Sequence, residues 1–184
     1  MKNQSLTKYI LRITMTLLII SVIVGAALAL VNQITKPIIA KAEAEKIQKA
    51  IAQVLPGGYD REITDFTDET GLVSRVYRGE NGYAVEVAPV GFDSAITMMV
   101  GIDLQGNVIG ISVVSHTETA GLGAVAAADS AAGQAFRQQF IGLSGSLAVT
   151  KDGGIIDAIT GATVTSRAIC AGVSAALACV AGLK

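Results

Sequence analysis

An uncharged apolar run extends from Ile13 to Val31 and limits the folds open to this chain. It reads ITMTLLIISVIVGAALALV. As a helix rising ~1.5 Å per residue, the run would span roughly 28 Å, close to the ~30 Å hydrocarbon core of a bilayer. It therefore predicts a transmembrane helix near the N-terminus.

A cleaved signal peptide is the competing interpretation of this segment. Lys2, Lys8 and Arg12 form a basic start, and Ala27-Leu28-Ala29 has the small residues of a cleavage site. The apolar run is longer than the ~7–15 residues typical of a signal sequence. We therefore favour an uncleaved anchor.

Charges on both sides of the run bear on its orientation. Basic residues precede the run, and others follow it at Lys36, Lys41, Lys46 and Lys49, interspersed with Glu43 and Glu45. Because a large following domain is translocated with little regard to its charge, we expect a cytoplasmic N-terminus. The prediction is a tail and single-pass anchor in residues 1–35 of the inner (plasma) membrane, then an extracytoplasmic domain in residues 36–184.

Composition excludes several classes of function. A net charge of -1 gives no basic footprint for nucleic acid. One histidine and two cysteines, with no HxxH or CxxC spacing, exclude a metal site on the ligand count. Cys170 and Cys179 fall on one predicted helix, about 13 Å apart along its axis, so we expect buried thiols and no disulfide.

Periodicity outlines the domain as an α+β fold. A helix is predicted to open at Lys36-Pro37, to carry an apolar stripe ending at Val54, and to stop at Pro56-Gly57-Gly58. Strands are predicted at Gly71–Arg78, Gly82–Val90, Ala95–Asp103 and Asn107–Val114, with a short one at Ile155-Ile156. An Ala-rich helical stretch runs to Phe140, and a final helix starts near Thr163. Short turns between the strands predict an antiparallel sheet with flanking helices.

The stretch DAITGATVTS, Asp157 to Ser166, concentrates hydroxyl groups before the final helix. Thr160 or Thr163 could cap that helix. The start of a helix among small residues also attracts anions, phosphate above all. The residues alone leave open whether a hydroxyl here caps the helix, binds a phosphate or bonds to it covalently.

The loop SHTETAGLG, residues 115–123, is the second candidate. GLGAVA resembles a dinucleotide fingerprint, but the preceding strands form hairpins and no βαβ unit follows. His116 has no nucleophile motif beside it, so a loop histidine with its hydrogen bonds satisfied is the default. Glu118, beside Thr119, could orient a polar ligand or be a solvated carboxylate. No catalytic residue is predicted.

Asp157-Ala158-Ile159-Thr160-Gly161-Ala162-Thr163 resembles the flavinylation motif Asp-x-x-(Ser/Thr)-Gly-Ala-(Thr/Ser) of FMN-binding domains. HTETAGLG is similar to that family's His-x-Glu-Thr-Pro-Gly-Leu-Gly loop, with Ala120 in place of the proline. The chain as a whole resembles the G subunits of the Rnf electron-transport complexes, which are ion-translocating ferredoxin:NAD+ oxidoreductases. The C subunits of the Na+-translocating NADH:quinone oxidoreductases share the motif but are usually longer.

The resemblance implies a phosphoester between FMN and Thr163, formed by a flavin transferase that takes FMN from FAD. Because FMN can take and pass single electrons, it implies an electron-carrier subunit whose partners are the other membrane and redox subunits. Further cofactor-binding residues are expected at Thr160, Gly161, Ala162, Thr165, Ser166, Glu118, Thr119, Leu122 and Gly123. Asp157 is expected to orient the motif for the transferase.

Two other functions remain as alternatives. A membrane-tethered module could bind a phosphorylated ligand without covalent chemistry, and its yellow colour would be lost on denaturation. An anchor subunit with a purely structural role would show no visible absorbance.

Overall fold

The computed structural model describes residues 2–183, so the first residue of the predicted anchor and the last residue of the predicted domain lie outside the described residues. The chain divides into two compact units, one up to Glu45 and one from Lys46 onward. Each unit is described by itself below.

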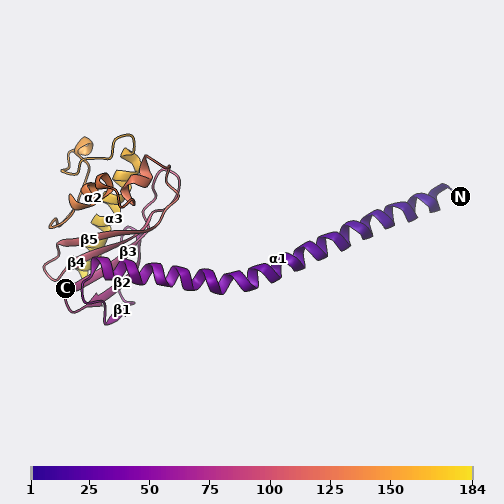
Figure 1. The fold of residues 1–184 in the computed structure, drawn as a ribbon, viewed down its shortest axis with the longest axis horizontal. Coiled ribbons are helices and arrows are strands. Elements are labelled where there is room, and N and C mark those ends of the chain that lie inside the picture. Colours follow the sequence, from indigo (N-terminus) through magenta and orange to yellow (C-terminus); the bar gives the residue numbers. More distant parts are fainter. Residues whose placement is uncertain (1, 184) are drawn as a thin grey trace. The chain divides into compact units, whose positions relative to one another are not determined.

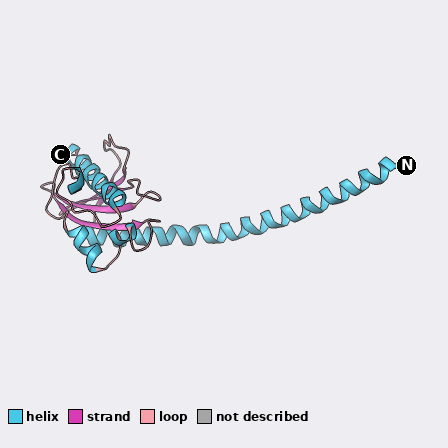
Figure 2. Cartoon of the chain, turned by 90° about the horizontal axis from the view of Figure 1, so that it is seen from above, coloured by secondary structure: helices cyan, strands magenta, loops and turns pink. Residues whose placement is uncertain are grey.

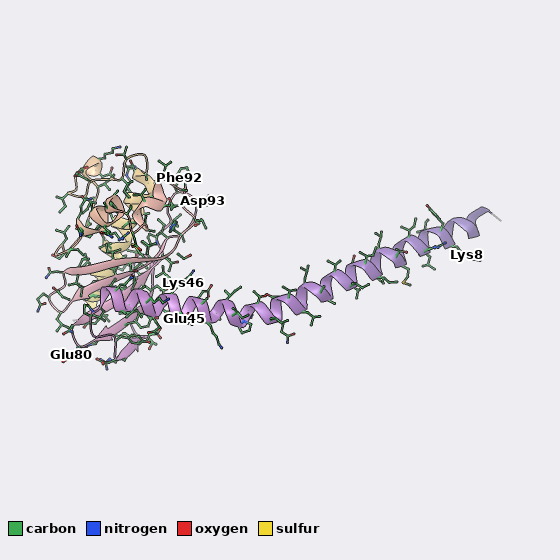
Figure 3. All side chains as sticks on the ribbon, viewed as in Figure 1. Lys8, Glu45, Lys46, Glu80, Phe92 and Asp93 are labelled. Carbon is green, nitrogen blue, oxygen red and sulfur yellow. The ribbon has the colours of Figure 1, made fainter. Side chains whose placement is uncertain are left out.

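The N-terminal helix α1 extends from Lys2 to Val54 (Figure 1). Its apolar part is long enough to cross a membrane. The most apolar 18-residue stretch has a mean hydropathy of 2.6, and none of that stretch is buried in the protein. Side chains from Lys8 to Glu45 are exposed around the whole helix (Figure 3). An exposed helix that is apolar on every side has the character of a membrane span.

The structure differs from the sequence prediction at Pro37, which lies inside α1 and does not open a new helix. Proline lacks a backbone N–H and costs about 3 kcal/mol in a helix interior. A helix of 53 residues remains continuous despite this loss, because the turns before and after Pro37 keep their own hydrogen bonds.

Five strands form one antiparallel meander, as the hairpin pattern predicts. In spatial order the strands are β1 (Arg61–Ile63), β2 (Val73–Gly79), β3 (Gly82–Val87), β4 (Thr97–Asp103) and β5 (Val108–Ser115). Gly79 pairs with Gly82, which leaves Glu80 and Asn81 as a two-residue turn. The sequence does not predict the edge strand β1, because three residues are too few to show an alternating pattern.

Helices cover both faces of the sheet within the second unit (Figure 2). On one face, Ile51 and Val54 of the last turns of α1 pack against Tyr77 and Met99. On the other, helix α3 (Thr163–Gly182) contributes its apolar side to the larger core. Adjacent strand residues point to opposite faces, so each strand can supply both cores. The α+β fold is thus confirmed.

The segment between β5 and α3 is less regular than its sequence suggests. The predicted helical stretch to Phe140 is divided into η1 (Gly123–Ala126) and α2 (Ala131–Gln138). Ser130 separates them because its hydroxyl caps α2 by accepting a hydrogen bond from Gly133 N at 3.2 Å. A third short helix, η2, covers Thr150–Asp152. The predicted strand at Ile155-Ile156 is only a single bridge between Ile156 and Val149.

The two cysteines lie on α3 as buried free thiols, in agreement with the sequence prediction. Burial raises the pKa of Cys170 to about 11 and also raises that of Cys179. We therefore expect neither thiol to react with iodoacetamide at pH 8 until the chain unfolds, because the reactive thiolate is scarce and inaccessible. Intact mass after labelling with and without denaturant tests this. Labelling of the folded chain would contradict the burial of α3.

Glu86 of β3 is a buried carboxylate whose Oε2 atom accepts no hydrogen bond; Arg75 Nε lies 3.9 Å away. Burial raises the pKa of Glu86 above its usual 4.5, and Arg75 only partly opposes this. Compared with the unfolded chain, the folded state thus binds the Glu86 proton more tightly. The stability that Glu86 contributes is fully present below pH 4.5 and is lost as the pH rises through the raised folded pKa.

Glu86→Gln is therefore expected to increase the free energy of unfolding at pH 7 by about 1–2 kcal/mol, with little gain at pH 4. Circular dichroism during thermal unfolding at both pH values measures this, since the chain has no tryptophan. Glu80→Gln, at an exposed position of the β2–β3 turn, is the matched control. An equal gain at both pH values would contradict the assigned titration.

Candidate functional site

The two sequence motifs meet at one cavity of about 310 Å³ beside the first turn of α3. The cavity is lined by Phe92, by Glu118, Thr119, Leu122 and Gly123, by Lys151, and by residues 161–165. The predicted site residues among these come from segments about 40 positions apart in the sequence. Thr160, Ser166 and Asp157 do not line the cavity.

A larger groove, of about 540 Å³, lies elsewhere along α3. Small side chains such as Ala171, Ser174 and Ala178 line it together with the loops at Gln105 and Ser144, and none of its lining residues is ionisable. The smaller cavity holds the charged and hydroxyl groups that chemistry requires, so we take it as the functional site.

Thr163 is the first residue of α3, and its side chain is half-buried at the cavity. The N-cap residue is Ala162, whose methyl group accepts no hydrogen bond. Neither Thr160 nor Thr163 is therefore the N-cap, which corrects the capping interpretation. A helix start without a side-chain cap leaves backbone N–H groups and the positive end of the helix dipole available to an anion.

Ser166 holds the motif loop in shape from inside the protein. Its hydroxyl is fully buried, accepts a hydrogen bond from Ile159 N at 3.0 Å and donates one to Ala162 O at 2.9 Å. The neighbouring Thr165 hydroxyl is also buried and donates to Glu118 Oε2. The structure thus gives these two hydroxyl groups a different use from the phosphate contacts that the sequence predicts.

Glu118 joins three segments around the cavity. Its Oε1 atom accepts hydrogen bonds from Phe92 N at 2.8 Å and Asp93 N at 3.2 Å, and its Oε2 atom accepts from Thr165. The side chain is only 8% exposed. Glu118 is therefore a buried brace between the β3–β4 loop, the 115–123 loop and α3, and the alternative of a solvated carboxylate is wrong.

Glycines make room for this brace. A Cβ atom on Gly91 would collide with Glu118 Oε1, and one on Gly123 would collide with Glu118 Oε2. Gly161 instead has a φ of +78°, which favours glycine, and a Cβ there would lie 2.9 Å from Leu122 Cδ2. These positions let the two motif loops approach closely.

His116 supports the same loop, as the default interpretation predicts. Its Nδ1 atom accepts a hydrogen bond from Glu118 N at 3.2 Å, and the ring is half-buried. The contact orients the backbone that carries Glu118. It is a local turn contact, and it places His116 in a structural role.

Lys151 is a site residue that the sequence motifs do not reveal. It belongs to η2, and its Nζ atom donates a hydrogen bond to Thr163 Oγ1 at 3.3 Å. Its neighbour Asp152 forms a two-bonded ion pair with Arg167 of α3, at 2.6 Å and 2.7 Å. The Arg167 hydrogen bonds lower the pKa of Asp152, and the same contacts raise the pKa of Arg167. The only sequence signal is a basic residue ahead of the Gly153-Gly154 turn.

Apolar side chains form the other side of the cavity. Phe92, also absent from the motifs, is 72% exposed on the β3–β4 loop next to Asp93 (Figure 3). Leu122 and Val164 line the cavity and are partly exposed. Exposed large apolar residues around a cavity are characteristic of a binding surface.

The start of the motif lies outside the cavity, where Gln139, the residue after α2, holds it. Asp157 and Thr160 are exposed. Gln139 fixes the backbone of Asp157 by two hydrogen bonds, accepting from its N–H at 2.7 Å and donating to its carbonyl at 3.2 Å. Asp157 is thus presented on the surface with its backbone held in place.

Taken together, the cavity has a polar end and an apolar end. The polar end holds the Thr163 hydroxyl, the Lys151 ammonium and an uncapped helix start, which suit a phosphate. The apolar end, with Phe92 and Leu122, suits a flat ring system. Among residues 2–183, no cluster of three potential metal ligands occurs.

Comparison with known proteins identifies the family to which the chain is similar. Residues 91–178 match the FMN-binding domain family, and residues 1–54 match the RnfG N-terminal region. The G subunit of an ion-translocating oxidoreductase complex from Methanosarcina acetivorans is 32% identical over 174 residues, covering 89% of this chain and 90% of that protein. The G subunit of a proton-translocating ferredoxin:NAD(+) oxidoreductase complex from Clostridium ljungdahlii is 36% identical over 176 residues, covering 91% and 90%.

A further relative is the G subunit of the Na(+)-translocating ferredoxin:NAD(+) oxidoreductase complex from Acetobacterium woodii. It is 29% identical over 188 residues, covering 91% of this chain and 89% of that protein. The two family models together include the apolar helix and both motif loops. The chain therefore belongs to the RnfG family, the G subunits of the ion-translocating oxidoreductase complexes.

Proposed function

We propose that this chain is an electron-carrier subunit that holds FMN through a phosphoester bond to Thr163. The observation that carries the proposal is the Thr163 hydroxyl at the cavity between the two motif loops, inside the segment that matches FMN-binding domains. FMN, when bound, supplies the ability to accept and pass on single electrons. The residues that line the cavity would hold it in place.

The attachment step transfers FMN from FAD. The oxygen of the Thr163 hydroxyl attacks the phosphorus on the riboflavin side of FAD and forms a new P–O bond. The bond from that phosphorus to the bridging oxygen breaks, AMP leaves with that oxygen, and the hydroxyl proton is released. A separate flavin transferase is the proposed catalyst, because the cavity has no general base in contact with Thr163 among its lining residues.

The remaining site residues have supporting roles in this proposal. Thr160, Gly161 and Ala162 shape the loop, with Ser166 and Thr165 holding it from within. Glu118 and Gly123 brace the cavity, and Thr119, Leu122 and Phe92 form its wall. Asp157 is exposed beside Gln139, and in this proposal the transferase would recognise it.

The same proposal includes a location. Residues 1–35 would form a cytoplasmic tail and a single membrane span, and residues 36–184 an extracytoplasmic domain facing the other membrane and redox subunits. The exposed apolar helix before Glu45 supports the span. A covalent bond would keep FMN on a domain that faces a compartment where free FMN is scarce.

The test is the intact mass of the denatured chain, extracted from membranes of a host that has the transferase. The expected increment is that of FMN less water, and peptide mapping should place it on Thr163. Colour that is lost on denaturation would indicate a reversible phosphate site. An unmodified, colourless chain from that host would overturn the proposal and leave a structural subunit.

A further inference from the structure

The geometry points to Lys151 as the residue that binds the phosphate group of FMN, with the Asp152–Arg167 ion pair as the positioning element that keeps its ammonium group there. This inference rests on the proposed attachment of FMN to Thr163. It assigns the phosphate contact to a residue outside both motif loops. It also replaces Thr165 and Ser166, whose hydroxyl groups are used within the protein.

The position of Lys151 is the first argument. Its Nζ atom is 3.3 Å from Thr163 Oγ1, the oxygen that would carry the phosphorus, and it lines the same cavity. A phosphate on that oxygen would place its unesterified oxygens two bonds beyond Oγ1, one bond from the phosphorus. An ammonium group beside Thr163 can then donate a charge-assisted hydrogen bond to one of them.

The charge inventory around the cavity is the second argument. Among the residues that line the cavity, the ionisable side chains are Lys151 and Glu118. The Glu118 carboxylate is turned away into the protein, where two backbone N–H groups and the Thr165 hydroxyl bind it. Lys151 is thus the cation that the lining residues offer to an anionic phosphate.

The third argument is how Lys151 is held. Asp152 follows it in η2, and Arg167 lies one turn after Thr163 on α3. Two parallel hydrogen bonds, at 2.6 Å and 2.7 Å, fix the distance between η2 and α3. Since a bidentate pair is specific in geometry, it fixes the register of the short helix against the long one and so the place of Lys151.

The test restores the charge chemically at a cysteine. Lys151→Cys is produced as the full chain without flavin, in detergent, from a host that lacks the transferase. Alkylation with 2-bromoethylamine creates a side chain with an ammonium group of nearly lysine length, whereas iodoacetamide creates a neutral one. The native cysteines do not interfere because both are buried on α3. Lys49→Cys, at an exposed position on the opposite layer of the sheet, is the matched control.

The readout is the rate at which purified transferase and FAD load each form with covalent flavin, measured by in-gel fluorescence at rising chain concentration. We expect the rate at saturating chain to fall about tenfold in the neutral form and to recover in the ammonium form. Asp152→Asn and Arg167→Gln should lower the same rate by a smaller factor. Both alkylated forms of Lys49→Cys should load like the unsubstituted chain.

Three results would overturn the inference. Equal loading of both alkylated forms would show that the charge does not matter. A rise in KM without a fall in kcat would show that Lys151 only docks the transferase. Unchanged loading of Asp152→Asn would remove the positioning role of the ion pair. Failure of the unsubstituted chain to load would instead overturn the proposed function itself.

Discussion

Thr163→Val is expected to abolish covalent FMN completely while leaving the fold intact. Valine has nearly the same shape as threonine but offers no oxygen to phosphorus. Thr163 is half-buried and its one side-chain hydrogen bond, to Lys151, is on the surface, so the free energy of unfolding should change by less than about 1 kcal/mol. The intact mass of the denatured chain measures the loss of flavin, and circular dichroism measures the fold.

Two control variants make this result specific. Thr67→Val removes an exposed hydroxyl outside both motif loops and should keep full loading, because Thr67 does not line the cavity. Thr163→Ser keeps a hydroxyl at the attachment position and should still be loaded. Covalent flavin on Thr163→Val, at any position of the peptide of residues 152–167, would refute the assignment of the attachment site.

Glu118→Ala is expected to have the second largest effect, on stability and on loading together. The substitution leaves the N–H groups of Phe92 and Asp93 and the hydroxyl of Thr165 without their acceptor. Loss of acceptors for buried donors should lower the free energy of unfolding by about 2–4 kcal/mol. The loops that Glu118 joins would then separate, so covalent loading should fall in parallel.

Glu118→Gln is the informative partner of this variant. Its amide oxygen can still accept from the two backbone N–H groups, and its amide nitrogen can donate to Thr165 if that hydroxyl rotates. We therefore expect a loss below about 1.5 kcal/mol and nearly normal loading. Glu80→Ala, in the exposed β2–β3 turn, is the control for removal of an acid. Thermal unfolding followed by circular dichroism ranks the variants, and unchanged stability of Glu118→Ala would refute the brace.

Much of the fold follows from local sequence patterns. The apolar run of Ile13 to Val31, the hairpins of the sheet and the start of α3 at Thr163 all depend on residues close to one another in the chain. Prediction from local patterns fails where the neighbouring turns of a helix override the preference of a single residue. Pro37 is typical of a helix start, but continuous helical turns on both sides retain it inside α1.

The sequence predicts which loops form the site but not what each of its polar groups does. The motif loops are recognisable from their residues, and the structure brings both to one cavity. The use of each hydroxyl is not predictable, because Thr165 meets Glu118 across 47 positions of the chain. Phe92 and Lys151 are not predicted either, because neither belongs to a motif and each reaches the cavity only through the folding of distant segments.

Local patterns in the sequence thus predict an apolar N-terminal helix, an antiparallel meander and a hydroxyl-rich loop at the start of the last helix. Long-range packing places Thr163 at the cavity beside Lys151 and turns Thr165 and Ser166 inward. Periodicity and turn chemistry act over a few residues, so they can be read along the chain. Which polar groups satisfy one another depends on packing between distant segments, and only the folded chain specifies those pairs.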